Sequence, residues 1–244
     1  GAAGARIGAE AVGLEIVYDG EGAVLPGQDQ APVISEIVNS GADWIYFVTS
    51  PGTTAEILGG VVAAGADVMA SGAFPAYDFR LLDTPVAEIM DARYYQSLYT
   101  VPWGESTPMN DEMMAALAEV YPDRRPSDSF IQGWHEGVIA HEVLKRAIAN
   151  GDLTRAGIVA AANSLEEIDF GGSAPNQRYA GDPNEKVTRE IAIYKPTLSA
   201  YMEAGGADQT MAQEGGTTGS VLFKDFFVSD AAKDFDFTEP CYSL

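Results

Sequence analysis

The chain has 244 residues, of which 46% are hydrophobic and 10% aromatic, so it can bury a substantial core. Its formal net charge of −22 argues against a nucleic acid partner, because binding to phosphates requires a basic patch. No apolar run approaches the roughly 18 residues that cross a bilayer, and the single cysteine, Cys241, cannot form an internal disulfide.

The first part of the chain alternates between predicted helices and predicted strands. Apolar periodicity predicts helices at residues 2–12, 29–39, 53–64 and 84–93, the last of which starts at Thr84-Pro85. Short apolar or alternating runs predict strands at residues 14–18, 44–48, 67–71 and 94–101. Strands that are separated by single helices pair in parallel through right-handed crossovers, so this part predicts an α/β fold with a parallel sheet flanked by helices.

The segment at residues 40–74 carries the strongest functional signal. Trp44–Val48 is a continuous apolar run that suits a strand buried on both faces, and Thr49–Gly52 then interrupts it. Thr53 or Thr54 can cap the helix that follows. Small polar residues at the carboxyl end of a strand in such a βαβ unit are where an open parallel sheet binds a small ligand. The segment offers hydroxyls and backbone amides, without a nucleophile, a base or a metal cluster.

After Pro102-Trp103-Gly104 the pattern changes to helices alone. Helices are predicted at residues 107–121, 128–149 and 152–165, with Asp152 as the expected cap of the third. A polar loop at 171–184 precedes a returning strand at 187–194, and only short elements are predicted after Lys195. These changes of pattern predict two lobes that are joined by more than one crossing of the chain.

Several short motifs, taken in their order along the chain, resemble one family. They are Gly1-x-x-Gly4, Gly13–Val17, Gly41–Asp43 before an apolar strand, Gly65-Ala66 after a helix, Gly133–Val138 with Ala147, and Ile168–Gly172. Their order and spacing over residues 1–195 resemble the type I periplasmic substrate-binding proteins of ABC transporters, specifically the branched-chain amino acid and amide branch (Leu/Ile/Val-binding protein-like).

The resemblance implies a periplasmic-binding-protein type I fold, in which two Rossmann-like lobes hold a ligand in the cleft between them. Residues 1–101 would be the carboxyl-terminal lobe. Residues 102–185 would be the hinge crossings and the helical part of the amino-terminal lobe, and residues 186–244 a return segment to the carboxyl-terminal lobe and a tail. The chain would then lack most of the first lobe.

The resemblance also places ligand-binding residues in the loops after the predicted strands and at the hinge crossing. These expected residues are Thr49, Ser50, Gly52, Phe74, Tyr77 and Trp103. The alternative is a structural role: Thr49 and Ser50 could cap the helix, whereas the three aromatic residues could pack beneath the loop or at the hinge. Amino-acid-binding members often carry an acidic residue just after the third strand, where this chain has Ser71–Ala73. The nearest carboxylate is Asp78, which argues against an α-amino acid ligand.

The expected function is that of a non-catalytic solute-binding protein in the periplasm or at the extracellular face of the cell membrane. It would capture a small polar molecule (an amino acid, an amide or a related metabolite) by hinge closure and deliver it to an ABC transporter membrane permease. A missing N-terminal segment would tether it to a membrane. No cofactor is expected, and His135 and His141 lack the spacing of helical metal ligands. The alternatives are a ligand-sensing receptor domain with the same fold and a Rossmann-like α/β enzyme.

Overall fold

The computed structural model describes residues 1–25 and 27–238, so Cys241 lies outside the described residues. The chain divides into two compact units. Unit 1 comprises Gly1–Leu98, Ala192–Gln209 and Thr217–Asp225, and unit 2 comprises Tyr99–Ile191, Thr210–Gly216 and the chain from Phe226 onward. The chain therefore passes between the two units more than once.

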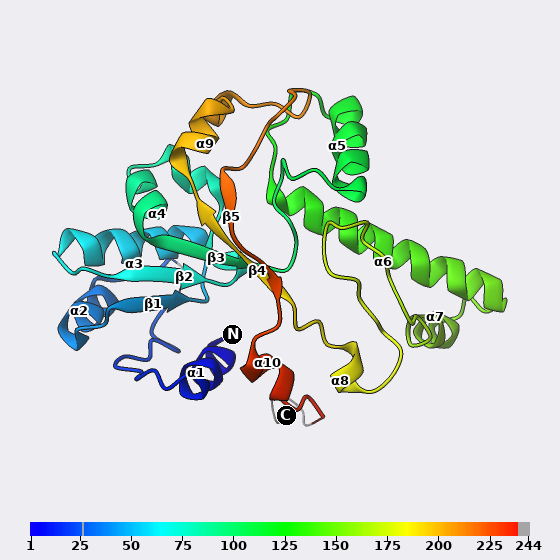
Figure 1. Cartoon of the computed structure of the whole chain (residues 1–244), viewed down its shortest axis with the longest axis horizontal. Coiled ribbons are helices and arrows are strands. Elements are labelled where there is room, and N and C mark those ends of the chain that lie inside the picture. The colour runs from blue at the N-terminus through cyan, green and yellow to red at the C-terminus, as the bar shows by residue number, and fades with distance from the viewer. Residues whose placement is uncertain (26, 239–244) are drawn as a thin grey trace. The chain divides into compact units, whose positions relative to one another are not determined.

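Unit 1 is built on a mixed, largely parallel sheet flanked by helices (Figure 1). Its helices are α1 (Ala2–Ala11), α2 (Ala31–Ser40), α3 (Pro51–Ala63), α4 (Ala87–Arg93) and α9 (Leu198–Glu203), with short 3₁₀ turns η1 (Phe74–Ala76), η2 (Phe79–Asp83) and η3 (Gly206–Asp208). The strands are β1 (Trp44–Phe47), β2 (Met69–Gly72), β3 (Tyr94–Leu98), β4 (Ile191–Pro196) and β5 (Ser220–Phe227), and they lie in this order across the sheet.

The pairing of the strands confirms the predicted α/β fold. β1 pairs in parallel with β2, from Trp44 opposite Met69 to Phe47 opposite Gly72, and β2 pairs in parallel with β3. β4 then runs antiparallel to β3, because the chain reaches it after passing through unit 2 and not through a single crossover helix. The sheet is therefore parallel where single helices connect its strands, as the sequence pattern predicts, and antiparallel where the chain returns.

The core of unit 1 lies between α2, α3, α4 and one face of the sheet. Ile57, Leu58 and Val61 of α3 are at most 1% exposed, and they pack in one cluster with strand residues such as Phe47 and Ala70. Full burial of each large aliphatic side chain stabilises the fold by about 1.5–3 kcal/mol. The core thus fixes α3 on β1 and β2, and it fixes the loop between β1 and α3 at the edge of the sheet.

The prediction of a strand at residues 14–18 is wrong. These described residues hydrogen-bond into no ladder, and Leu14 and Val17 remain 67% and 46% exposed. The amide of Leu14 instead donates to the carbonyl of Ala9, which turns the chain at the end of α1. A strand needs a neighbouring strand to satisfy its backbone groups, and an apolar run alone does not supply one.

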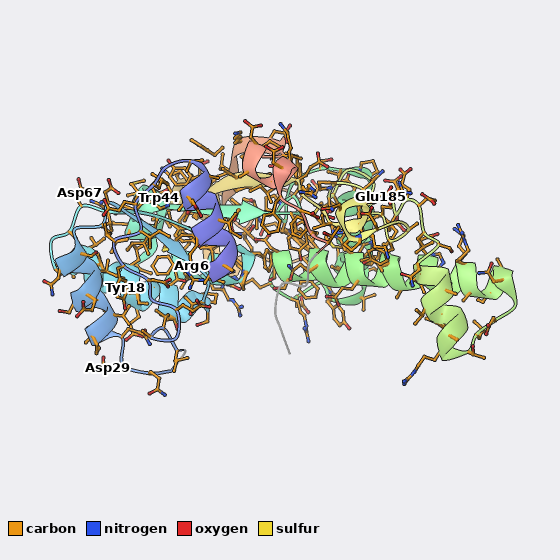
Figure 2. All side chains as sticks on the ribbon, turned by 90° about the horizontal axis from the view of Figure 1, so that it is seen from below. Arg6, Tyr18, Asp29, Trp44, Asp67 and Glu185 are labelled. Carbon is orange, nitrogen blue, oxygen red and sulfur yellow. The ribbon has the colours of Figure 1, made fainter. Side chains whose placement is uncertain are left out.

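Helix α1 confirms the predicted helix at residues 2–12, although none of its residues is buried. Arg6, which is labelled on this helix in Figure 2, forms ion pairs with Asp19, at 2.8 Å, and with Glu21. All three side chains are at least 40% exposed, so each pair contributes at most about 1 kcal/mol. Surface contacts of this kind, and not a buried face, hold α1 to the loop that follows it.

Unit 2 is mainly helical. Its helices are α5 (Pro108–Val120), α6 (Asp128–Asn150), α7 (Arg155–Ala162), α8 (Pro183–Lys186) and α10 (Asp230–Asp234), and α7 packs on α6 (Figure 1). Thr107, where the first of these helices is predicted to start, caps α5, and α6 ends at Gly151, whose φ of 71° suits glycine. None of the helices in the described part of the chain has both the length and the apolar character that a membrane span needs.

Three predicted boundaries are corrected by local hydrogen bonds. α7 is capped by Thr154 and not by Asp152, whose carboxylate accepts from the amide of Thr154. Thr84 and Pro85 form a turn before α4, which begins at Ala87. The returning strand begins at Ile191, later than predicted, and its ladder with β3 runs from Ala192 to Tyr194. In the first two cases a side chain or turn next to the predicted position satisfies the terminal backbone groups.

Candidate functional site

The carboxyl ends of β1 and β2 form one edge of the sheet. Because the two strands are parallel and Phe47 lies opposite Gly72, the loops that follow them begin side by side. The amide of Ala73 donates to the carbonyl of Phe47 at 3.1 Å, which joins the starts of the two loops. The amino end of α3 opens at the same edge. We call the residues 49–54 and 72–78 in these loops, together with Tyr94, the carboxyl-edge site.

Ser50 has a structural task at this edge. Its hydroxyl accepts from the amide of Thr53 and lies 3.0 Å from the hydroxyl of Thr53, so Ser50 is the cap of α3. The prediction that Thr53 or Thr54 caps this helix is therefore wrong, because Pro51 already starts the helix. Gly52 is exposed, and an added Cβ would meet nothing within 4 Å, so the first turn of α3 is open to an approaching group.

Two threonine hydroxyls at the edge are buried without a partner. The hydroxyl oxygens of Thr49 and Thr54 have no hydrogen bond to any residue that the structure describes, and Thr54 is fully buried. Buried hydroxyls are nearly always paired, since each unpaired one costs free energy. Thr49 was predicted as a ligand-binding residue, whereas Thr54 was predicted only as a possible cap.

Tyr94 brings a third hydroxyl to the same edge. It is the first residue of β3 and is fully buried, and its ring stacks on that of Tyr77 at a centroid distance of 5.6 Å. Its hydroxyl lies so close to Gly72 that a Cβ there would collide with it, and the hydroxyl has no hydrogen-bond partner among the described residues. Burial, with a smaller effect of Tyr46, raises the pKa of Tyr94, so the phenol stays protonated and can donate.

The two aromatic residues predicted from the second loop differ in exposure. Tyr77 is 6% exposed and belongs to the core of unit 1, whereas Phe74 in η1 is half-buried. Tyr77 thus packs beneath the loop, the structural role that sequence reasoning left open, while its ring also supports Tyr94. Phe74 is the predicted aromatic residue that remains partly accessible at this edge.

The carboxyl-edge site has little charge. Asp78 is the only charged residue in the sequence of its two loops. Both carboxylate oxygens of Asp78 accept from the guanidinium of Arg80 at 2.7 Å, and one also accepts from the amide of Arg80. Asp78 caps the turn η2 through this last bond. Its charge is therefore already compensated by a cation, and the hydroxyls and amides are the main polar groups of the site.

Trp103 belongs to the other unit. Its side chain is 3% exposed in a core cluster of unit 2 with Met113, Ile131 and Met211, and its amide donates to Asp128. The burial favours the packing role, and a ligand contact of Trp103 stays a prediction. The structure thus gathers five of the six predicted site residues in unit 1 and puts the sixth in unit 2.

A second group of buried polar residues lies in unit 2. His135 contacts the hydroxyl of Ser173 at 2.8 Å, and this hydroxyl donates to the side-chain carbonyl of Asn110 at 2.6 Å. Asn110 in turn donates to the carbonyls of Pro102 and Glu105. Burial lowers the pKa of His135 to about 4, so the imidazole is neutral at pH 7. This network holds the segment after β3 in place. Its one hydroxyl, that of the fully buried Ser173, donates its proton to Asn110 and not to His135.

Metal ligands are not gathered anywhere in the described chain. No group of three or more His, Cys, Asp or Glu side chains within residues 1–25 and 27–238 has the arrangement to hold an ion. His141, the other histidine, is exposed beside Glu142. The structure therefore offers hydrogen-bonding groups at the carboxyl-edge site without pointing to a cofactor.

Sequence reasoning missed Thr54 and Tyr94. Thr54 could have been found from its place on the first turn of a helix that follows a strand. Tyr94 gives no such signal, because it opens the strand after the next helix and its hydroxyl reaches the edge only across the face of the sheet. The one sequence signal was Gly72, which the hydroxyl of Tyr94 faces, since a glycine inside a strand often marks a close approach by another group.

Comparison with known proteins shows which proteins this chain is similar to. A family model described as periplasmic binding protein matches residues 1–207. The chain is similar to the fatty acid ABC transporter substrate-binding protein from Thermomonospora curvata, with 23% identity, a TM-score of 0.76 and coverage of 94% of this chain and 54% of that chain. No curated protein sequence matches the chain.

Two further solved structures are similar to it. A branched chain amino acid ABC transporter protein from Thermus thermophilus with bound valine has 16% identity and a TM-score of 0.67, over 94% of this chain and 57% of that one. A solute binding protein of an ABC transporter from R. palustris in complex with benzoate has 14% identity and a TM-score of 0.55. This match covers 86% of this chain and 51% of that one. The chain thus spans little more than half the length of these structures, and the likeness is one of fold.

Proposed function

Because the chain belongs to the periplasmic binding protein family, we propose that it acts in a substrate-binding protein, which captures a small polar molecule and delivers it to an ABC importer. The observation that carries this proposal is the carboxyl-edge site. The amino end of α3 and three buried hydroxyls without a partner among the described residues meet there, where an open α/β sheet binds ligands. The solved neighbours are named for a fatty acid, valine and benzoate, and each of these compounds carries a carboxyl group.

The proposed action is binding without turnover. Ligand would bias an equilibrium between open and closed lobes by its higher affinity for the closed arrangement. The proposed partner is an ABC transporter permease, and the proposed location is the periplasm or the outer face of the cell membrane, with a membrane tether. A hydrolase or transferase would need a nucleophile with a base in reach, and the carboxyl-edge site has hydroxyls with neither a histidine nor an uncompensated carboxylate in its loops.

The proposed lobes follow the predicted boundaries. Residues 1–101 would form the carboxyl-terminal lobe, residues 102–185 the hinge crossings and the helical part of the other lobe, and residues 186–244 the return segment and tail. In support of this assignment, unit 1 runs to Leu98 and takes up the chain again at Ala192. The proposed ligand-binding residues are the six that the sequence predicts: Thr49, Ser50, Gly52, Phe74, Tyr77 and Trp103.

The test is isothermal titration calorimetry of the protein expressed from its whole gene, against a library of small metabolites, with a turnover assay on each compound that binds. One ligand with a dissociation constant in the micromolar range or tighter and no turnover is expected. Phe74→Ala should weaken that binding about tenfold, because it removes apolar contact at the edge. Phe223→Ala, at a 62% exposed position on β5, is the matched control and should leave the affinity unchanged. Steady turnover of any bound metabolite would contradict the proposal.

A further inference from the structure

We propose that the carboxyl-edge site selects a ligand with a carboxylate or another oxygen acceptor and without an ammonium group. This inference rests on the proposed function, and it assigns the class of ligand. It depends on three features of the site: its charge, the space at position 72 and the buried hydroxyls.

An ammonium group would find no free anion at this edge. The carboxylate of Asp78 accepts two bonds from the guanidinium of Arg80 and one from its amide, so it is occupied. Placing a second cation there would bring it next to Arg80, and an ammonium that loses its water without gaining a carboxylate is strongly disfavoured. The loops therefore favour a ligand that is anionic or neutral.

The end of β2 has no room for a carboxylate side chain. At Gly72 an added Cβ would collide with the hydroxyl of Tyr94, would lie 2.8 Å from the Cβ of Ala76 and 3.0 Å from the carbonyl oxygen of Phe47. Two of these neighbours are fixed parts of the core or the backbone. The packing of Tyr94 thus keeps position 72 a glycine, and it places a neutral hydroxyl where an acidic side chain could otherwise stand.

The groups that do lie at the edge suit an acceptor. The amino end of the 13-residue helix α3 carries partial positive charge, and the side chain of Ser50 caps it without adding a negative charge. Thr54 and Tyr94 are fully buried, and their hydroxyls have no partner among the described residues. Each can donate one hydrogen bond to an oxygen that enters beside it, which would satisfy a group that is otherwise costly to bury.

The ligand class is tested with pairs of compounds that differ only in the ammonium group: 4-methylpentanoate with leucine, and 3-phenylpropanoate with phenylalanine. Both pairs are titrated calorimetrically into the protein expressed from its whole gene, beside the metabolite library. In each pair that binds, the acid is expected to bind about 100-fold more tightly than the α-amino acid. If an α-amino acid binds equally well or better, the inference fails and the proposed function stands. If no compound in the pairs or the library binds, both fail.

The role of Tyr94 is tested by removing its hydroxyl alone. Tyr94→Phe keeps the stacked ring, so the urea midpoint should stay the same or rise, while the affinity for the tightest-binding acid should fall about fivefold. Tyr201→Phe is the matched control in the same unit, because the buried Tyr201 donates to Asp83 at 2.7 Å. This control should lower the urea midpoint and leave the affinity unchanged. An unchanged affinity in Tyr94→Phe would overturn the assignment of its hydroxyl to the ligand.

Discussion

The neutral His135 should make the stability of unit 2 depend on pH in a defined range. Burial lowers the pKa of His135 from its ordinary value of 6.5 to about 4. Its ring contacts the hydroxyl of Ser173, and the ring centroids of His135 and Phe170 lie 4.5 Å apart. In the unfolded chain the imidazole takes up a proton near pH 6.5, and in the folded chain it does so only near pH 4. The stability associated with the neutral ring is therefore fully present above pH 6.5 and is lost as the pH falls toward 4.

The magnitude follows from the size of the shift. A pKa lowered from 6.5 to about 4 corresponds to a change of at most about 3 kcal/mol in the free energy of unfolding. About 2 kcal/mol of this is lost between pH 7 and pH 4.5. The chain has 36 acidic residues, and carboxylates also titrate near the lower end of this range. The pH dependence of the wild type alone therefore does not isolate the contribution of His135. His135→Gln removes the titrating group and keeps a side-chain amide that can reach Ser173.

The assay is urea unfolding at a series of pH values from 7 to 4.5, followed by tryptophan fluorescence, since Trp103 belongs to a core cluster of unit 2 and Trp134 packs against it. Over this range the free energy of unfolding should fall by about 2 kcal/mol more in the wild type than in His135→Gln. His141→Gln, an exposed histidine on the same helix, should follow the wild type. Parallel curves for the wild type and His135→Gln would refute the reasoning that the ring is buried and neutral.

Two further predictions concern the carboxyl-edge site. Ser50→Ala removes the cap of α3 and should lower the free energy of unfolding by about 1 kcal/mol in urea, as well as weaken ligand binding; an unchanged midpoint would show that the cap adds no stability. Gly72→Ala should destabilise the fold by about 1–3 kcal/mol, because the new methyl group collides with the Tyr94 hydroxyl and approaches Ala76. Adding Tyr94→Phe to it should restore part of the loss, and equal stability of the single and double variants would contradict the proposed contact.

The sequence by itself determined the elements whose signals are local. Trp44–Phe47 and Met69–Gly72 are parallel neighbours, as their apolar runs and the intervening helix predict. Thr107 caps α5 and Gly151 ends α6, because a capping hydroxyl and a left-handed glycine act within one helical turn. The loop residues Thr49 and Ser50 could be placed at the carboxyl end of a strand for the same reason, because they follow β1 directly. The prediction that this strand is buried on both faces is wrong, since β1 lies first in the strand order and Trp44 and Tyr46 are 48% and 45% exposed.

Tertiary structure decided the features that depend on a partner far along the chain. Residues 14–18 have the composition of a strand, yet no neighbouring strand pairs with them in the described structure. Tyr94 enters the carboxyl-edge site because three-dimensional packing carries its hydroxyl to Gly72. Apolar patterning, capping and the pairing of Asp78 with Arg80 involve a few consecutive residues, whereas strand pairing and the burial of a hydroxyl arise only when distant segments meet.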